Sequence, residues 1–282
     1  MSKLGIPSIT KLEETVRLSL EEDIGLGDIT GELIDSNLLQ NASLICREES
    51  ILCGSKWFET AFTILDPTIH IQWHFEEGAL LEAGSEIASL YGNAKCMVAS
   101  ERTALNFLQM MSGIAYKTHC FQKELSGSET VLLDTRKTLP GLRYEQKYSV
   151  VIGGGQNHRM GLYDAALIKE NHISSAGSIE SAVSLLREKG IEKIEVEVEN
   201  LEELKQAINS KADIAMLDNF SEDDLRIASE ISKEKIKLEI SGNIDIGNLD
   251  AIKKYKIDYI SSGDLTKNIT ATDYSLIFKK ID

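Results

Sequence analysis

The second half of the chain alternates short apolar runs with amphipathic stretches, and this alternation limits the possible folds more than any other feature. Six runs have the length and apolar content of buried strands: Val131–Leu133, Ala165–Ile168, Ile194–Val198, Ile214–Leu217, Lys237–Ile240 and Tyr259–Ser261. Four stretches between them have helical periodicity: Ile179–Lys189, Leu201–Ser210, Glu222–Lys233 and Ile246–Lys254. Strands that alternate with helices are typical of parallel βαβ units. Six strands in about 135 residues favour an α/β barrel over a two-layer sheet.

The first half of the chain has a different pattern. A helix is predicted from about Thr10 to Glu22, and β-type runs follow at Ala42–Cys46, Ile69–Phe75 and Glu86–Tyr91. A second helix is expected to begin near Ser100 as its N-cap and to be interrupted at its end by Gly113. A chain of 282 residues is long enough for one large domain or two domains, and both halves indicate an α/β protein.

Composition excludes several classes of function. The formal net charge of −15 argues against a general surface for nucleic acid or anionic membrane, although a local cationic pocket can exist in an acidic protein. No apolar run reaches 18 residues, and the start MSKLGIPSITKLEE lacks the apolar core of a signal peptide. The four cysteines are scattered and form no CxxC pair, so buried thiols are expected instead of a zinc site. We expect a soluble, cytoplasmic protein.

Polar residues follow every predicted strand of the second half. In α/β barrels the active site lies on the loops after the carboxyl ends of the strands. The residues at these ends are Asp134 to Lys137, Lys169 to His172, Glu197, Asp218 with Asn219, Ser241 to Asn243, and Ser262 with Gly263. Any one of them could be a solvated loop residue. Because all six groups fall at the same end of successive strands, we expect a site there.

The segment from Asp134 to Lys169 is cationic within this acidic chain. It holds six cations and three acids, a balance of +3: Arg136, Lys137, Arg143, Lys147, Arg159 and Lys169 against Asp134, Glu145 and Asp164. Arginine binds carboxylate or phosphate groups in a bidentate manner, so this segment suits a substrate with several negative charges. Arg143 and Lys147 are spaced as on a helix surface, where ion pairs with nearby acids explain them, and they are left out of the predicted site.

Three further segments could bind anions. Gly153 to Gly155 form a flexible loop that leads to His158 and Arg159, although a lone histidine is more often a packed core residue. The turns Ser241-Gly242-Asn243 and Ser262-Gly263 could expose backbone amides to a phosphate, or could be ordinary turns. If the second helix begins near Ser100, Arg102 lies in its first turn. A bound anion at the helix N-terminus could pair with Arg102, or the neighbouring Glu101 could be its partner instead.

Several of these motifs together resemble the quinolinate phosphoribosyltransferase family, also called nicotinate-nucleotide pyrophosphorylase (carboxylating). The similar segments are ERTALN (101–106), DTRKTLPGLR (134–143), GGGQNHRMGL (153–162), LIKENHI (167–173), MLDNF (216–220) and the early EDIG and GDIT (22–25 and 27–30). They span nearly the whole chain in the order that the family has.

The resemblance implies a fold and an assembly. It implies an N-terminal α/β sandwich over residues 1–112, joined by a C-terminal tail at about 268–282, and an incomplete α/β barrel of the type II phosphoribosyltransferase kind over residues 113–267. It also implies a homodimer, or a larger assembly, in which the helix that carries Arg102 completes the partner's site.

The resemblance also implies a reaction and a role for each site residue. Quinolinate and phosphoribosyl pyrophosphate would give nicotinate mononucleotide, pyrophosphate and CO₂, with Mg²⁺, as a step of NAD biosynthesis. Quinolinate would lie among Arg102, Arg136, His158, Arg159 and Lys169, and Thr135 would also bind substrate. Lys137, Glu197 and Asp218 would be the catalytic residues beside phosphoribosyl pyrophosphate, and Glu197 and Asp218 would also hold the magnesium. The 5′-phosphate would lie on Ser241, Gly242, Asn243, Ser262, Gly263 and Asp264.

One residue departs from the family pattern. Asp264 follows Gly263 where a small neutral residue is usual, and an anion beside a phosphate is unfavourable unless it points away.

Two alternative functions compete with this interpretation. One alternative is the molybdenum-transport-associated relative that shares the barrel; Lys169 in LIKENH favours the quinolinate enzyme, because it would meet a substrate carboxylate. The other is a non-catalytic anion-binding scaffold, against which every expected charged position is present.

Overall fold

A computed structural model describes residues 9–279, and the chain divides into two compact units. Of the described residues, the unit that we call the N-terminal unit comprises 9–119, 144–154 and 269–279. The other, the barrel unit, comprises residues 120–143 and 155–268. The predicted domain boundary at residue 112 differs from this division, which places residues 113–119 and 144–154 with the N-terminal unit.

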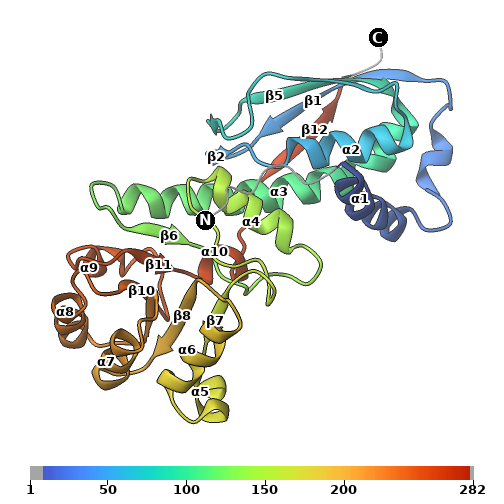
Figure 1. Ribbon diagram of the computed structural model, residues 1–282. Helices are drawn as coiled ribbons and strands as arrows, with labels where there is room; N and C mark the ends of the chain where they lie inside the picture. Colours follow the sequence, from blue (N-terminus) through green and yellow to red (C-terminus); the bar gives the residue numbers. More distant parts are fainter. Residues whose placement is uncertain (1–8, 280–282) are drawn as a thin grey trace. The chain divides into compact units, whose positions relative to one another are not determined.

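A four-stranded antiparallel sheet organises the N-terminal unit (Figure 1). Its order is β12-β1-β5-β3, formed by Tyr274–Phe278, Leu39–Cys46, Glu86–Asn93 and His70–Trp73. Strand β12 comes from the end of the chain and pairs with β1 from Ala42↔Phe278 to Cys46↔Tyr274. A small second sheet pairs β2 (Ser50–Ile51) with β4 (Leu80–Leu81). The strands predicted in this half therefore exist, with shifted ends.

Helices of the N-terminal unit carry its largest core residues. They are α1 (Ile9–Ile24), the short 3₁₀ helix η1 (Thr30–Leu33), α2 (Ser55–Leu65) and most of α3 (Ala94–Glu124) and of α4 (Arg143–Ile152). The sequence analysis missed α2. Its residues Trp57, Phe58 and Phe62 are fully buried, and Phe58 meets the Trp73 ring edge-on at 5.5 Å between centroids. Aromatic residues suit strands as well as buried helices, which is why this segment resembled β structure.

Helix α3 begins earlier and ends later than predicted. Asn93, not Ser100, caps its start: the Asn93 side-chain oxygen accepts the Cys96 amide hydrogen at 3.0 Å. The Ser100 hydroxyl lies inside the helix and donates to the Cys96 carbonyl. Gly113 does not end the helix but permits a close contact, because a Cβ atom there would lie 2.0 Å from the Thr270 carbonyl oxygen. The predicted N-cap at Ser100 and the interruption at Gly113 are therefore wrong.

Six parallel strands form the sheet of the barrel unit. Its order is β6-β11-β10-β9-β8-β7, formed by Val131–Leu133, Tyr259–Ser261, Lys237–Ser241, Ile214–Asp218, Ile194–Val198 and Ala166–Ile168. All six predicted strands are confirmed, with ends that agree to within one residue. Within residues 9–279, the two edge strands β6 and β7 do not pair with each other, so the barrel is not closed. The isolated bridge Leu133↔Gln156 extends the β6 edge. The sheet is thus the incomplete barrel that was expected.

Helices follow the barrel strands and run along one side of the sheet (Figure 1). They are α5 (Glu170–Ala176), α6 (Ile179–Glu188), α7 (Leu201–Asn209), α8 (Glu222–Ile231), α9 (Leu249–Ile252) and α10 (Asp264–Lys267). Side chains cap three of their starts, at Ser178, Asn200 and Ser221. Among the residues described, no helix has the length and apolar character needed to cross a bilayer.

Candidate active site

The carboxyl ends of the six parallel strands gather the predicted residues of the barrel unit at one edge of the sheet. Asp134 follows β6 directly, Lys169 follows β7, and Asp218 and Ser241 are the last residues of their strands. Register places Ser241 beside Asp218 on neighbouring strands. Residues from all six strand ends therefore lie around one opening, which is the arrangement expected of an α/β-barrel site.

Two carboxylates and two lysines form one side of this site. The Lys169 ammonium group pairs with Glu197, which lies within β8. Burial raises the pKa of Asp218, and the negative charge of Glu197 raises it further, while the charges of Lys169 and Lys137 lower it. These four groups therefore share one electrostatic environment, which can hold a cationic centre between carboxylates and an anionic group beside the lysines.

Two arginines form another side. Burial lowers the pKa of Arg159, and the positive charge of Arg136 acts in the same direction. The Arg159 guanidinium donates to the Ala165 carbonyl at 3.2 Å, while the buried Nε of Arg136 has no hydrogen-bond partner among the described residues. A carboxylate bound here would reduce the repulsion between the two guanidinium groups, and it could accept the hydrogen bond that the Arg136 Nε has available.

His158 is held from both sides of its ring. Its Nε2 lies 3.0 Å from Glu195 Oε2 and 3.7 Å from Glu239 Oε2, and its Nδ1 accepts the backbone amide hydrogen of Arg159 at 2.8 Å. Burial raises the pKa of Glu195 to about 7, and burial with the Glu195 charge raises the pKa of Glu239 to about 8. Since both ring nitrogens have protein partners, a direct contact of His158 with quinolinate stays a prediction.

Sequence reasoning missed Glu195 and Glu239. Both are buried in strands β8 and β10, and neither was singled out because each lies inside a predicted strand, not at its end. A signal was available: Glu195 and Glu197 alternate with valines in IEVEV, so both point to the same face of the strand. A charge on the inner face of a barrel strand needs a partner, and the partner here is His158.

Two glycine turns lie against the catalytic candidates. A Cβ atom on Gly242, whose φ is +98°, would lie 2.4 Å from the Asn219 side-chain oxygen and 3.1 Å from Asp218 Oδ1. A Cβ atom on Gly263 would lie 2.9 Å from Lys137 Cδ and 3.5 Å from Thr135 Oγ1. The positive φ of Gly242 favours glycine, while at Gly263 the nearest atom belongs to the flexible Lys137 side chain. The turns over residues 241–243 and 262–264 thus border Asp218 and Lys137.

Asp264 has a partner outside this predicted phosphate site. Its Oδ1 accepts a hydrogen bond from the Asn268 side chain at 2.6 Å, and its backbone amide donates to the Ser262 hydroxyl at 3.2 Å. The Ser262 hydroxyl in turn donates to the Ile244 carbonyl at 2.6 Å. Ser262 and Asp264 therefore stabilise the turn itself, and the departure from the family pattern is accommodated by Asn268.

Three cations outside the strand ends differ from their predicted settings. Arg102 is exposed and lies in the interior of α3, in the N-terminal unit, so the prediction that it occupies the first helical turn is wrong. Lys147 is fully buried, so its assignment to a helix surface is also wrong. Arg143 donates to the Thr138 hydroxyl at 3.2 Å and to the Met160 carbonyl at 3.1 Å, so it supports the loops beside the site.

Two groups of side chains could be considered for a metal ion. In the described part of the chain, His158, Glu195 and Glu239 offer ligand atoms that all lie within 4.8 Å of one another. The direct hydrogen-bond distance from His158 to Glu195 marks a side-chain network instead of a metal cage. Glu197 and Asp218 offer the carboxylate oxygens that Mg²⁺ prefers; they lie in the neighbouring strands β8 and β9, and the negative charge of Glu197 contributes to the raised pKa of Asp218. This pair fits Mg²⁺ better.

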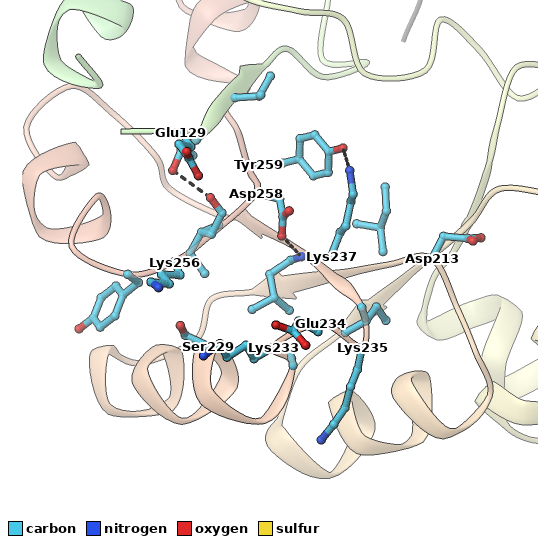
Figure 2. Close-up of a pocket in the computed structure, with 18 of the residues that line it drawn as sticks. Glu129, Asp213, Ser229, Lys233, Glu234, Lys235, Lys237, Lys256, Asp258 and Tyr259 are labelled. Atoms are coloured by element: carbon cyan, nitrogen blue, oxygen red, sulfur yellow. Dashed lines mark hydrogen bonds between the residues drawn. The ribbon is translucent and has the colours of Figure 1, made fainter. Parts of the chain in front are cut away.

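A pocket of about 1310 Å³ lies at the other end of the barrel strands, before their first residues (Figure 2). Eight lysines line it: Lys193, Lys211, Lys233, Lys235, Lys237, Lys253, Lys254 and Lys256. Most of them follow the last residues of α7, α8 and α9, where a cation complements the negative end of the helix dipole. Lys237 donates to the Tyr259 hydroxyl at 3.1 Å. Helix ends explain most of these lysines, and the predicted site residues lie at the opposite end of the sheet.

Comparison with known proteins agrees with the geometry. A barrel with cations, paired carboxylates and glycine turns at its strand ends is typical of an enzyme that transfers a phosphorylated sugar. Residues 28–112 match the N-terminal domain of quinolinate phosphoribosyl transferase, and residues 114–277 match its C-terminal domain. The chain belongs to the quinolinate phosphoribosyltransferase family.

Individual relatives are similar over nearly their whole length. The chain is 39% identical to the probable nicotinate-nucleotide pyrophosphorylase (carboxylating) of Bacillus subtilis (strain 168), over 90% of this chain and 89% of that protein. It is 38% identical to the protein of the same description from Synechocystis sp., over 86% of this chain and 84% of that protein. The structure of the nicotinate-nucleotide pyrophosphorylase from Francisella tularensis matches with a TM-score of 0.95, 47% identity and 99% coverage of both chains.

Proposed function

We infer that this protein transfers the phosphoribosyl group of phosphoribosyl pyrophosphate to quinolinate, and that decarboxylation then gives nicotinate mononucleotide, pyrophosphate and CO₂. The observation that carries this inference is the pairing of a two-arginine side with a carboxylate–lysine side at one set of strand ends. The names of the curated relatives support the same activity, a step in NAD biosynthesis. A molybdenum-transport role and a non-catalytic scaffold are not favoured by these comparisons.

Quinolinate is a dicarboxylate, and the arginine side suits it. Arg136 and Arg159 would bind its carboxylates, and the unused Nε donor of Arg136 supports a ligand at this place. Lys169, which pairs with Glu197 in this structure, would turn to a substrate carboxylate when one is bound. Each charge-assisted hydrogen bond of this kind contributes about 1.5–3 kcal/mol. Thr135 and His158 would line the same pocket.

Phosphoribosyl pyrophosphate would lie on the other side. Lys137 would meet its phosphates, and the turns at Gly242 and Gly263, which lie beside Asp218 and Lys137, would approach its 5′-phosphate. As the bond from C1′ to the pyrophosphate oxygen breaks, positive charge develops on the ribose ring. The carboxylates of Glu197 and Asp218 stabilise that charge electrostatically. The quinolinate nitrogen forms the new bond to C1′.

Decarboxylation needs little from the protein. Once the ring nitrogen is bonded to C1′ it is cationic, and it accepts the electron pair released when the 2-carboxylate leaves as CO₂. A proton from solvent then replaces the carboxylate on the ring carbon. The arginine side need only hold the intermediate and limit its hydration, so we assign no separate base to this step.

We propose Mg²⁺ as the cofactor, held by Glu197 and Asp218 together with the substrate. Two carboxylates on neighbouring strands suit a magnesium site, which takes one or two protein carboxylates and completes its shell with phosphates and water. When bound, Mg²⁺ would neutralise charge on the departing pyrophosphate. Calorimetric titration of Mg²⁺ into protein with pyrophosphate tests this, and weaker binding in Asp218→Asn is the expected result.

We further propose a homodimer in which the partner's Arg102 contributes to the quinolinate pocket, and a location in the cytoplasm. The exposure of Arg102 on α3 supports the first, because an exposed arginine is available to another subunit. The four free cysteines, two of them buried, support a reducing compartment. Sedimentation velocity of the purified chain and fractionation of the source cells test these two proposals.

The experiment that tests the activity is a product assay. The purified chain is incubated with quinolinate, phosphoribosyl pyrophosphate and Mg²⁺, and nicotinate mononucleotide and released CO₂ are measured. The expected result is both products in equal amounts. Absence of both would contradict the proposed function, and equal use of nicotinate without CO₂ would assign the chain to a non-decarboxylating reaction.

A further inference from the structure

A buried network lies beneath the proposed quinolinate pocket, inside the barrel unit. Glu195 is 6% exposed and lies in β8, two residues before Glu197; Glu239 is 0% exposed and lies in β10, two residues before Ser241. Because alternate residues of a strand share a face, Glu195 and Glu239 point to the same side as these site residues but one layer deeper. They cannot touch a substrate that the strand ends bind, and the mechanism above does not use them.

The geometry of His158 connects this layer to the site. Its Nδ1 accepts the Arg159 amide hydrogen at 2.8 Å, so Nδ1 carries no proton in this arrangement. The ring proton is then on Nε2, which lies 3.0 Å from Glu195 Oε2 and donates to it. Glu195 therefore selects one tautomer of His158, and that tautomer is the one that can accept the Arg159 amide.

The peptide between His158 and Arg159 is fixed by this arrangement. The His158 amide donates to Asp134 Oδ1 at 2.9 Å, and the Asn157 side chain donates to Asp134 Oδ2 at 2.5 Å, so the start of the segment is tied to the end of β6. The Arg159 amide has the His158 ring as its acceptor. If the ring turned, this amide would lose its partner and the segment that carries the Arg159 guanidinium would lose one of its anchors.

Burying two carboxyl groups in the barrel interior costs free energy, and the need to fill space does not explain why acids occupy these two positions. An apolar residue of similar volume at either position would avoid the desolvation of a carboxyl group. Neither Glu239 oxygen, nor Glu195 Oε1, has a hydrogen-bond donor among the described residues. Both acids direct an oxygen to the same His158 nitrogen, at 3.0 and 3.7 Å.

We propose that Glu195 and Glu239 are positioning residues of the quinolinate pocket, which act through His158 on the peptide unit that carries Arg159. Glu195 is the direct acceptor of the His158 Nε2 proton, and Glu239, two strands away in the same sheet, adds a carboxyl oxygen 3.7 Å from the same nitrogen. The proposal rests on the proposed function for its substrate, but the state of the His158 ring does not depend on that function.

Steady-state kinetics of matched variants test the role in binding. Glu195→Gln keeps an oxygen that accepts from Nε2, and Glu195→Met keeps the length but removes the acceptor. We expect Glu195→Met to raise the KM for quinolinate about tenfold or more, with the KM for phosphoribosyl pyrophosphate changed less than about threefold. Glu195→Gln should restore the KM for quinolinate to within about threefold of wild type. Glu188→Gln, on the exposed surface of α6, is the control.

A purely structural role predicts a different pattern. Lower thermal stability with both KM values unchanged, or an equal rise of both, would overturn the proposal. Glu195→Ala, in which water can occupy the freed space, is the second acceptor-removing variant if Glu195→Met does not fold. Its expected kinetic pattern is the same.

Nitrogen-15 NMR of the histidine rings provides a readout that is independent of activity. The chain has only five histidines, and the His158 signals can be assigned by their loss in His158→Asn. We expect wild-type His158 to show the neutral Nε2–H tautomer at pH 7.5, and Glu195→Met to lose that pattern. A wild-type Nδ1–H tautomer would overturn the proposal even if the product assay succeeds. The expected tautomer with no product would leave the positioning network intact and contradict only the proposed function.

Discussion

Lys169 interacts electrostatically with two carboxylates of this site. It follows β7, pairs with Glu197, and by its charge lowers the pKa of Asp218. Its ammonium group thus offsets the negative charge of both carboxylates. In the proposed mechanism, the same group would exchange Glu197 for a carboxylate of quinolinate. The cost of holding Glu197 and Asp218 together is thereby reduced before either substrate is bound.

Lys169→Ala should weaken quinolinate binding more than phosphoribosyl pyrophosphate binding. The variant loses a charge-assisted hydrogen bond worth about 1.5–3 kcal/mol, so the Kd for quinolinate should rise about tenfold to a hundredfold. Calorimetric titration of each substrate measures this, with Lys189→Ala at an exposed position as the control. A larger loss for phosphoribosyl pyrophosphate would move Lys169 to that substrate.

Glu239 should make the stability of the protein depend on pH. Its pKa is raised from an ordinary 4.5 to about 8 by burial and by the Glu195 charge, so the folded protein binds a proton there that the unfolded chain releases. Stability from this group is present at about pH 5 and is lost as the pH rises to about 8. The Tm of Glu239→Gln should therefore fall less over this range than the Tm of wild type. Equal slopes in a thermal-shift series would contradict the assignment, and Glu188→Gln should behave as wild type.

Elements of the barrel unit could be predicted from the sequence because each strand is an apolar run between turn residues, and each such run is short. The same reasoning failed where the local pattern is ambiguous. The aromatic residues of α2 suit a strand equally well, and the start of α3 is set by Asn93 at the end of a strand, where no break in apolar character marks it. Burial of Lys147 depends on what packs around α4, which no local pattern contains.

The residues of the candidate site could also be predicted only in part from the sequence. Its charged residues at strand ends could be predicted, since parallel strands bring their carboxyl ends together whatever the loops do. The network of Glu195 and Glu239 could not, because recognising it requires knowing that β8 and β10 direct these residues toward one histidine. Distances between strands depend on barrel register, which the sequence does not show.

Gly113 should be needed for packing inside α3 and not for flexibility. A Cβ atom there would lie 2.0 Å from the Thr270 carbonyl oxygen, so Gly113→Ala forces the backbone apart. We expect the free energy of unfolding to fall by about 1–3 kcal/mol. An alanine at an unobstructed helix position would instead add about 1 kcal/mol, so the sign of the change in Tm decides between the two cases.

Lys233 should contribute to stability through the end of α8 and not through a ligand. It follows the C-cap residue Ser232 and lines the lysine-rich pocket of Figure 2. Lys233→Glu should lower the free energy of unfolding by about 0.5–1 kcal/mol, and Lys233→Gln by about half as much. Both KM values should stay within about twofold of wild type, and a larger change in either would show that this pocket takes part in substrate binding.

At the scale of the whole molecule, the charge is arranged unevenly. The chain carries a net charge of −15, yet its proposed substrates are anions and its predicted site segment has a balance of +3. The net charge therefore opposes the approach of an anionic substrate from a distance, and binding of quinolinate would depend on cations within the pocket. An additional cation from a second subunit would add to those contacts. This is the physical reason to expect that the partner's Arg102 matters.

Mixing two inactive variants tests this shared site. Arg102→Ala removes the arginine that we propose a subunit gives to its partner, and Lys137→Ala removes a proposed catalytic residue that a subunit would keep for its own site. In a hybrid dimer one site then has both mutations, and the other has neither. Random exchange makes about half of the dimers hybrids, each with one complete site, so activity should return to about a quarter of the wild-type value. Each variant alone is the control, and exchange is verified with differently tagged subunits. If tagged hybrids form and activity does not return, Arg102 acts within its own subunit or not at all.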